Sequence, residues 1–143
     1  MIEKADVVII GGGINGCSLA YELSKKGKDV VVLEKNYLAS GATGRCGAGI
    51  RQQWSTKENA ILAIKSVKKF ECLTDELEAD IGLRQGGYLI AIHDEEEMKQ
   101  AEKNVKMQRS LGLEVKILDE QGIKEVVPIL DVKGMDAIAA TFC

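Results

Sequence analysis

Residues 7–16 read VVIIGGGING, a short apolar run that enters a glycine-rich turn. A helical pattern follows over Asn15–Lys26, and Gly27 occupies the position of a C-terminal cap. A second apolar run, Asp29–Leu33, then leads into Glu34. The order of strand, glycine-rich turn, helix, strand and acid predicts an α/β fold with parallel strands.

Each part of this unit has a physical role in binding a dinucleotide. Gly11 allows a sharp turn, Gly13 lets a pyrophosphate approach the backbone, and Gly16 allows the helix to pack closely on the strands. The helix N-terminus offers N–H groups and partial positive charge to the phosphates. Glu34 is placed to accept hydrogen bonds from both hydroxyls of an adenosine ribose, and its charge disfavours the 2′-phosphate of NADP. The alternative, a glycine-rich turn without a ligand, leaves the agreement of strands, helix and acid unexplained.

The composition indicates an ordinary globular protein. The chain has 143 residues, 45% hydrophobic and 29% charged, which is enough for one domain with a core. The net charge is −3 and basic residues alternate with acids, so we expect no nucleic-acid partner. No apolar stretch is long enough to span a membrane, and we expect a cytoplasmic protein. The four scattered cysteines form no CxxC pair, so we expect free thiols and no metal site.

The second half of the chain predicts further helices and strands. Ser55 and Glu58 form the pattern of a capping box, with Ser55 as the N-cap of a helix that continues to about Asp80. Two more helices are expected to begin at the N-caps Asp94 and Asp119. Strands are expected at residues 88–92, 114–118 and 137–142. The last of these stops abruptly, which suggests a chain that is cut before its fold is complete.

A small-residue loop follows the first unit: residues 40–54 read SGATGRCGAGIRQQW. Glycine and alanine allow the backbone to lie against a flat ligand, and the two arginines can contact anionic groups. Arginine and tryptophan are unusual in a plain linker. This loop therefore predicts a ligand-facing segment.

Residues 7–35, 40–45 and 49–53 together resemble the N-terminal part of the FAD-dependent D-amino-acid oxidase (DAO) superfamily, above all the sarcosine oxidase β-subunit type. Glycine oxidase and dye-linked proline dehydrogenase are relatives of that type. The segments 86–89 and 118–128 also fit, so the resemblance covers nearly the whole chain. It implies a Rossmann-like, glutathione-reductase-like FAD-binding region at residues 1–82. Residues 83–143 would begin an inserted α+β substrate domain in a chain shorter than its family.

The resemblance also implies roles for individual residues. The implied FAD contacts are Gly11, Gly13, Ile14, Asn15, Gly16, Glu34, Lys35, Ala42, Thr43, Arg45, Gly49 and Ile50. Arg51 matches a position that can face a substrate carboxylate, a role that suits a bidentate, always-charged guanidinium. A salt bridge that orders the loop is the equal alternative for Arg51.

The function that the resemblance implies is a flavoprotein oxidoreductase. It would oxidise the C–N bond of a small amino acid or N-methyl amino acid, such as sarcosine, glycine or proline, by hydride transfer to flavin. A partner subunit or self-association fits the β-subunit likeness. Two alternatives stay open. One is a non-catalytic FAD-binding segment that needs a partner or its missing C-terminal half. The other is an NAD-dependent dehydrogenase, against which the long glycine-rich loop argues.

Overall fold

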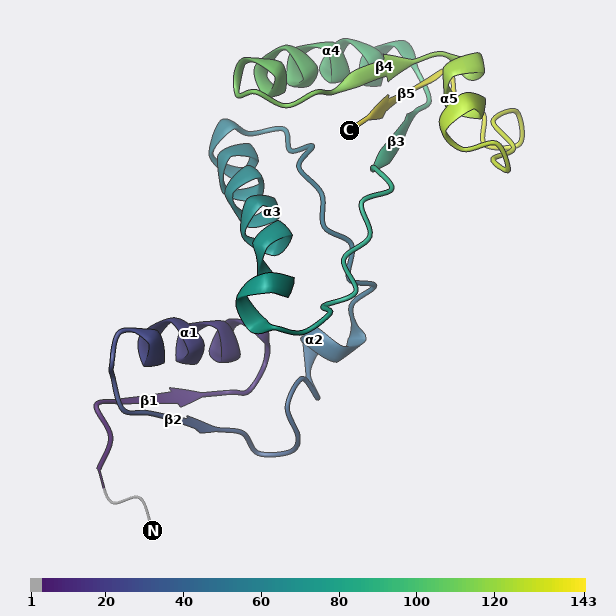
Figure 1. The fold of residues 1–143 in the computed structure, drawn as a ribbon. Helices are drawn as coiled ribbons and strands as arrows, with labels where there is room; N and C mark the ends of the chain where they lie inside the picture. Colours follow the sequence, from purple (N-terminus) through teal and green to yellow (C-terminus); the bar gives the residue numbers. More distant parts are fainter. Residues whose placement is uncertain (1–3) are drawn as a thin grey trace. The chain divides into compact units, whose positions relative to one another are not determined.

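The computed structural model describes residues 4–143, and these form two compact units. The first unit ends at Gly49 and the second is Ile50–Cys143. Figure 1 follows the helices and strands through both units in sequence order. Helices and strands alternate along the chain, which agrees with the expected α/β class. The expected division into residues 1–82 and 83–143 stays a prediction.

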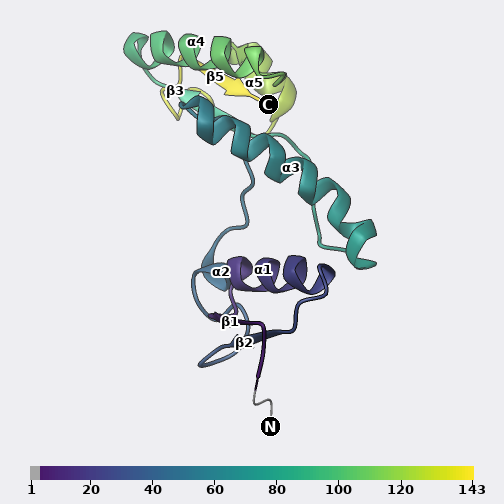
Figure 2. The same ribbon diagram turned by 90° about the vertical axis from the view of Figure 1, so that its left-hand side faces the viewer.

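The first unit contains a parallel strand pair joined by a helix. Strand β1 (Val7–Ile10) pairs with β2 (Val30–Leu33), with Val7 opposite Val30, and α1 (Ile14–Lys25) connects them. Figure 2 shows α1 lying alongside these strands. Gly27 follows the helix with a left-handed φ of 75°, as a C-terminal cap requires. The predicted order of strand, turn, helix and strand is confirmed.

The two faces of this strand pair differ in exposure. Ile9 is buried, with a relative exposure of 8%, and it lies on the side of α1. Val8, Ile10 and Leu33 are 55%, 90% and 54% exposed. The strands are therefore apolar on both faces, but only one face is packed among the described residues.

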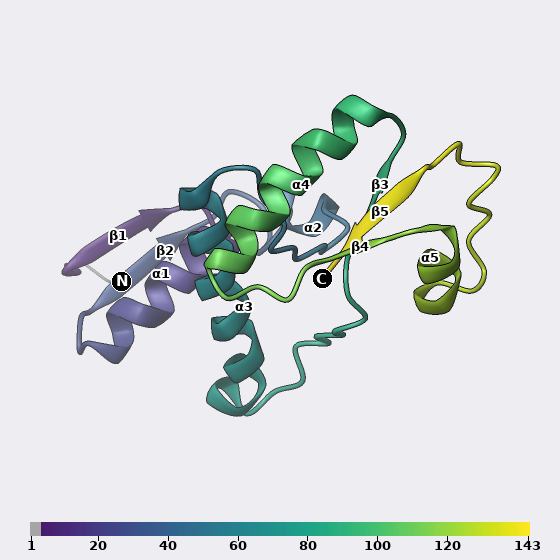
Figure 3. The ribbon, with the colours of Figure 1, turned by 90° about the horizontal axis from the view of Figure 1, so that it is seen from above.

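The second unit is built around an antiparallel sheet of three strands in the order β3-β5-β4. The strands are β3 (Leu89–Ile92), β4 (Lys116–Leu118) and β5 (Ala139–Phe142). The helices are α3 (Lys57–Leu77), α4 (Glu95–Ser110) and α5 (Glu120–Val126). Figure 3 shows β5 between the other two strands, with α4 beside the sheet.

Two apolar clusters hold the second unit together. The first joins the end of α4 to the chain that enters β4, through Val105, Leu113 and Val115. The second packs Ile123 of α5 and Val132 against Ala140 of β5. The first cluster therefore holds α4 beside β4, and the second holds α5 beside β5.

The helix caps were predicted in part. Asp94 accepts a hydrogen bond from the Glu97 N–H (2.8 Å) and Asp119 accepts one from Gly122 (2.8 Å), which confirms both aspartate caps. The predicted capping box is wrong. Helix α3 begins after Thr56, whose extended backbone makes it the N-cap without a side-chain hydrogen bond.

Two further details differ from the sequence-based expectation. Helix α3 ends at Leu77 rather than Asp80, because Glu78 adopts a left-handed φ of 52°. The glycine-rich loop contains a short helix, α2 (Ala42–Arg45), where irregular structure was expected. Within residues 4–143, no helix combines the length and apolar character that a membrane crossing needs.

Candidate functional site

The glycine-rich turn places the N-terminus of α1 directly after β1. Gly11 has a φ of 103°, a conformation that favours glycine, and its N–H donates to the Leu33 carbonyl at 2.8 Å. A Cβ at Gly16 would collide with the Gly11 carbonyl oxygen. Gly11 therefore suits the sharp turn and Gly16 is needed for the close approach of helix and strand, as the sequence predicted.

Glu34 lies at the end of β2 with both carboxylate oxygens held by the backbone. Oε2 accepts from the Gly12 N–H at 2.8 Å and Oε1 accepts from the Asn36 N–H at 3.0 Å. The bond from Gly12, followed by that from Asn36, lowers the pKa of this carboxyl below its ordinary value. Glu34 is thus an oriented anion, and each oxygen keeps a lone pair for a further donor such as a ribose hydroxyl.

Gly12 is a part of this site that the sequence reasoning missed. A Cβ at Gly12 would strike the Leu38 side chain and approach Glu34 Cβ to 3.3 Å. The Gly12 carbonyl also accepts from the Ala39 N–H at 2.9 Å. The chain that follows β2 therefore folds over the turn and depends on a glycine there. The signal was present as a third consecutive glycine, one more than the GxGxxG spacing requires.

Thr43 on α2 reaches the first turn of α1. Its hydroxyl oxygen accepts from the Ile14 N–H at 3.0 Å and lies 3.2 Å from the point where a Cβ of Gly13 would stand. The first helical bond runs from the Cys17 N–H to Gly13, so the N–H groups of Asn15 and Gly16 have no intrahelical acceptor. These N–H groups and the Thr43 O–H are donors suited to a phosphate.

The other residues predicted to contact FAD make no contacts with other described residues that define a role. Lys35, Ala42 and Arg45 are exposed in the first unit, and Gly49 is its last residue. Ile50 and Arg51 open the second unit and are described with it. The structure therefore brings the glycine turn, Glu34 and Thr43 together, and the roles of the other residues stay predictions.

Arg51 is held by an aromatic side chain. Its guanidinium lies 4.2 Å from the centroid of the Trp54 ring, and the Trp54 Nε1–H donates to the Arg51 carbonyl at 3.3 Å. Among residues 4–143, Arg51 forms no ion pair. The loop-ordering salt bridge that was the alternative for Arg51 thus has no partner in the described part of the chain.

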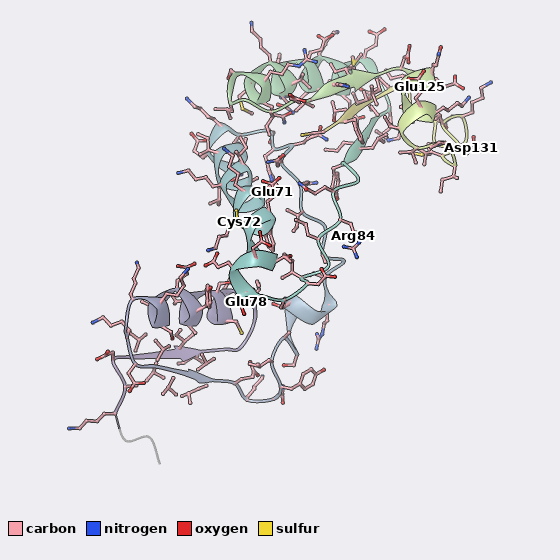
Figure 4. All side chains as sticks on the ribbon, in the orientation of Figure 1. Glu71, Cys72, Glu78, Arg84, Glu125 and Asp131 are labelled. Atoms are coloured by element: carbon pink, nitrogen blue, oxygen red, sulfur yellow. The ribbon has the colours of Figure 1, made fainter. Side chains whose placement is uncertain are left out.

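Polar groups elsewhere serve local structure. Figure 4 shows Glu71 and Cys72 on α3 and Arg84 on the segment that follows this helix. Glu71 accepts from the Gln85 amide at 2.8 Å, and Arg84 donates to the Leu83 carbonyl. No set of three or more His, Cys, Asp or Glu side chains in the described chain is arranged to hold a metal ion.

The first unit fits the ADP half of FAD. An ionised carboxylate with free lone pairs lies beside the glycine turn, where an adenosine ribose can donate to it. The missing side chain of Gly13 lets the Thr43 hydroxyl approach the first turn of α1, where the free N–H groups and this hydroxyl can donate to a pyrophosphate. The donors and acceptors thus match the two polar parts of that cofactor half.

Comparison with known proteins gives the same answer. Residues 6–142 match the family described as FAD dependent oxidoreductase (DAO). The chain is 35% identical over 132 residues to sarcosine oxidase subunit beta of an Arthrobacter species, covering 91% of this chain and 33% of that protein. It is similar to the crystal structure of L-proline dehydrogenase from P. horikoshii, with a TM-score of 0.91, 38% identity, and coverage of 99% and 37%.

A further solved relative is glycine oxidase from Geobacillus kaustophilus, with a TM-score of 0.84, 27% identity, and coverage of 96% of this chain and 38% of that chain. The chain thus spans about a third of the length of the relatives it matches. FAD, the cofactor expected from the sequence, is the one that the family description names. Since the family match covers nearly all residues, this chain belongs to the FAD dependent oxidoreductase (DAO) family.

Proposed function

We propose that this chain is the N-terminal, FAD-binding part of an oxidoreductase that oxidises the C–N bond of a small amino acid or N-methyl amino acid. The observation that carries the proposal is the oriented Glu34 carboxylate beside the glycine turn. The substrate class is supported by the names of three relatives, a sarcosine oxidase subunit, an L-proline dehydrogenase and a glycine oxidase.

The residues of the chain divide the work of holding cofactor and substrate. Glu34 accepts hydrogen bonds from the ribose, and the first turn of α1 with Thr43 donates to the pyrophosphate. FAD, when bound, would supply the hydride acceptor for oxidation of the carbon beside the substrate nitrogen. Arg51 binds the substrate carboxylate and thereby orients that carbon.

The arrangement of the complete protein is part of the same proposal. Residues 1–82 contribute to a Rossmann-like, glutathione-reductase-like FAD domain, and residues 83–143 begin an inserted α+β substrate domain. We include in the proposal that the complete protein binds a partner subunit or self-associates, because one relative is named as a subunit. The cytoplasmic location inferred from the sequence stays a prediction.

A flavin titration tests the proposal on the chain itself. FAD is added to the 143-residue chain and to its Glu34→Gln variant, and flavin fluorescence is followed with NAD as a competitor. We expect FAD to bind, NAD to compete poorly, and the variant to bind FAD more weakly. Displacement of FAD by equimolar NAD would instead favour the NAD-dependent dehydrogenase.

A second candidate is a non-catalytic FAD-binding segment that acts only with other polypeptide. The observation that favours it is the exposed apolar face of the first unit, where Val8, Ile10 and Leu33 lie open. The complete product of the reading frame decides between the two. Reduction of its bound FAD by sarcosine, glycine or proline supports the oxidoreductase, and an oxidised flavin with every amino acid tested supports the segment.

A further inference from the structure

Two buried carboxamides hold the segment that carries Arg51. The Gln53 Nε2–H donates to the Tyr88 carbonyl at 2.6 Å, and the Gln108 Nε2–H donates to the Trp54 carbonyl at 2.9 Å. Both side chains are buried, at 6% and 3% exposure. The segment is thus fixed at two successive residues, once to the residue that precedes β3 and once to α4.

Gln108 is an unexpected residue in its position. Its Oε1 is buried and has no hydrogen-bond partner among the described residues. Rotating the amide by 180° would direct this oxygen at the Trp54 carbonyl, so the observed orientation is fixed. An unsatisfied buried acceptor destabilises the folded state, whereas leucine would fill the site without that cost. The geometry therefore points to the bond with Trp54 as the use of this glutamine.

The Trp54 side chain, whose backbone is held by Gln108, contacts Arg51 in two ways. The indole Nε1–H donates to the Arg51 carbonyl at 3.3 Å, and the guanidinium stacks over the ring at 4.2 Å. Stacking occupies the face of the guanidinium and leaves its N–H edge for a ligand. Because Arg51 is exposed and forms no ion pair in the described chain, that edge is available to an anion.

We propose that Trp54 and Gln108 are positioning residues that hold the Arg51 guanidinium in advance for the carboxylate of a small amino acid. This inference rests on the proposed function, in which Arg51 binds that carboxylate. The physical gain is that an arginine side chain already held in one orientation loses less conformational freedom when the ligand binds.

The first test measures carboxylate binding in the complete protein carrying this chain, purified with its FAD. Propionate is the probe, followed by the flavin absorbance change, with neutral propionamide as its match. We expect Trp54→Leu to weaken propionate binding about 2- to 5-fold, the size of an exposed cation–π contact. For Gln108→Leu we expect about 2- to 10-fold, the size of one hydrogen bond.

The kinetic readout separates positioning from damage to the fold. Both variants should raise KM for the amino acid by similar factors and leave kcat within about twofold, because the groups lost do not contact the reacting atoms. Trp54→Phe should retain most of the affinity, since its ring can still stack. The control is Gln100→Leu, which replaces an exposed glutamine of the same helix whose side chain donates to Asn104, and it should change neither constant.

The second test needs no cofactor. Trp54 is the single tryptophan of the 143-residue chain, so its fluorescence reports on the stacked pair directly. Arg51→Ala and Gln108→Leu should both shift the emission, and Gln100→Leu should not. An emission that is unaffected by Gln108→Leu would contradict the link between α4 and Trp54.

The outcomes distinguish the inference from the function on which it rests. If Arg51→Ala weakens propionate binding while Trp54→Leu and Gln108→Leu do not, the positioning role is refuted and the proposed function stands. If Arg51→Ala leaves propionate binding unchanged, the carboxylate role of Arg51 fails and the inference fails with it. Should Gln108→Leu not fold, Trp54→Leu decides alone, with circular dichroism and FAD content as checks.

Discussion

Replacing Gly16 by alanine tests whether the close packing of α1 on β1 is required. The added Cβ would meet the Gly11 carbonyl oxygen, a backbone atom that moves only if the turn or the helix shifts. Overpacking against such a fixed neighbour costs about 2–3 kcal/mol. Alanine in a helix gains about 1 kcal/mol over glycine, so the net loss is about 1–2 kcal/mol. At roughly 2–4 °C per kcal/mol, Tm should fall by roughly 2–8 °C.

The assay combines urea and thermal unfolding, both followed by far-UV circular dichroism, with titration of FAD by flavin fluorescence. Gly47→Ala is the matched control, because the φ of Gly47 lies outside the left-handed region and an added Cβ would have no atom within 4 Å. We expect the control to stay within about 0.5 kcal/mol of the wild type. If Gly16→Ala were as stable as the wild type, helix propensity alone would act there and the packing argument would be refuted.

Three further substitutions address the site and the fold. Glu34→Gln should weaken FAD binding about tenfold in a fluorescence titration. Because folding lowers the pKa of the Glu34 carboxyl below its ordinary value of 4.5, the ionised carboxylate stabilises the fold above pH 4.5, and this stabilisation is lost as the pH falls through the folded pKa. The variant should therefore show a shallower acid transition by circular dichroism. Thr43→Val should weaken FAD binding about 3- to 10-fold, because valine lacks the hydroxyl that is proposed to donate to the phosphate; circular dichroism checks whether the lost bond from the Ile14 N–H also alters the fold, and equal affinity would contradict the phosphate role. Asp94→Ala should lower the free energy of unfolding by about 1 kcal/mol in urea, through loss of the bond from Glu97, and Asp94→Asn should restore most of it.

Local patterns predicted the features that depend on neighbouring residues. The strand–turn–helix–strand order came from apolar runs around a glycine turn, and its bounds agree with the structure to within a residue. Asp94 was identified as a cap because three acidic residues follow it in the first turn of a helical pattern, and Asp119 because it precedes a short helical segment that ends at Val126. In these segments the local signal and the tertiary contacts favour the same structure.

Contacts between distant residues could not be predicted in this way. The bond from Gly12 to Glu34 spans 22 residues and that from Gln108 to Trp54 spans 54, and neither leaves a periodic trace in the sequence. Ser55 and Thr56 are both good N-caps, and the backbone conformation of Thr56 decided between them. The turn of helix at Thr43 forms in a glycine-rich loop, where local propensity is against it.

The same bonds that define the candidate FAD site also hold the first unit together. Glu34 joins the end of β2 to the turn after β1, and Thr43 joins α2 to the start of α1. A two-stranded sheet with Ile10 90% exposed has little apolar burial to stabilise it. A ligand that bridges Glu34 and α1 therefore adds its binding free energy to the stability of the fold, about 2.7 kcal/mol at a hundredfold excess over Kd. We therefore expect FAD binding at this candidate site and folding of the unit to be coupled, so that each substitution at Gly16, Glu34 or Thr43 acts on both.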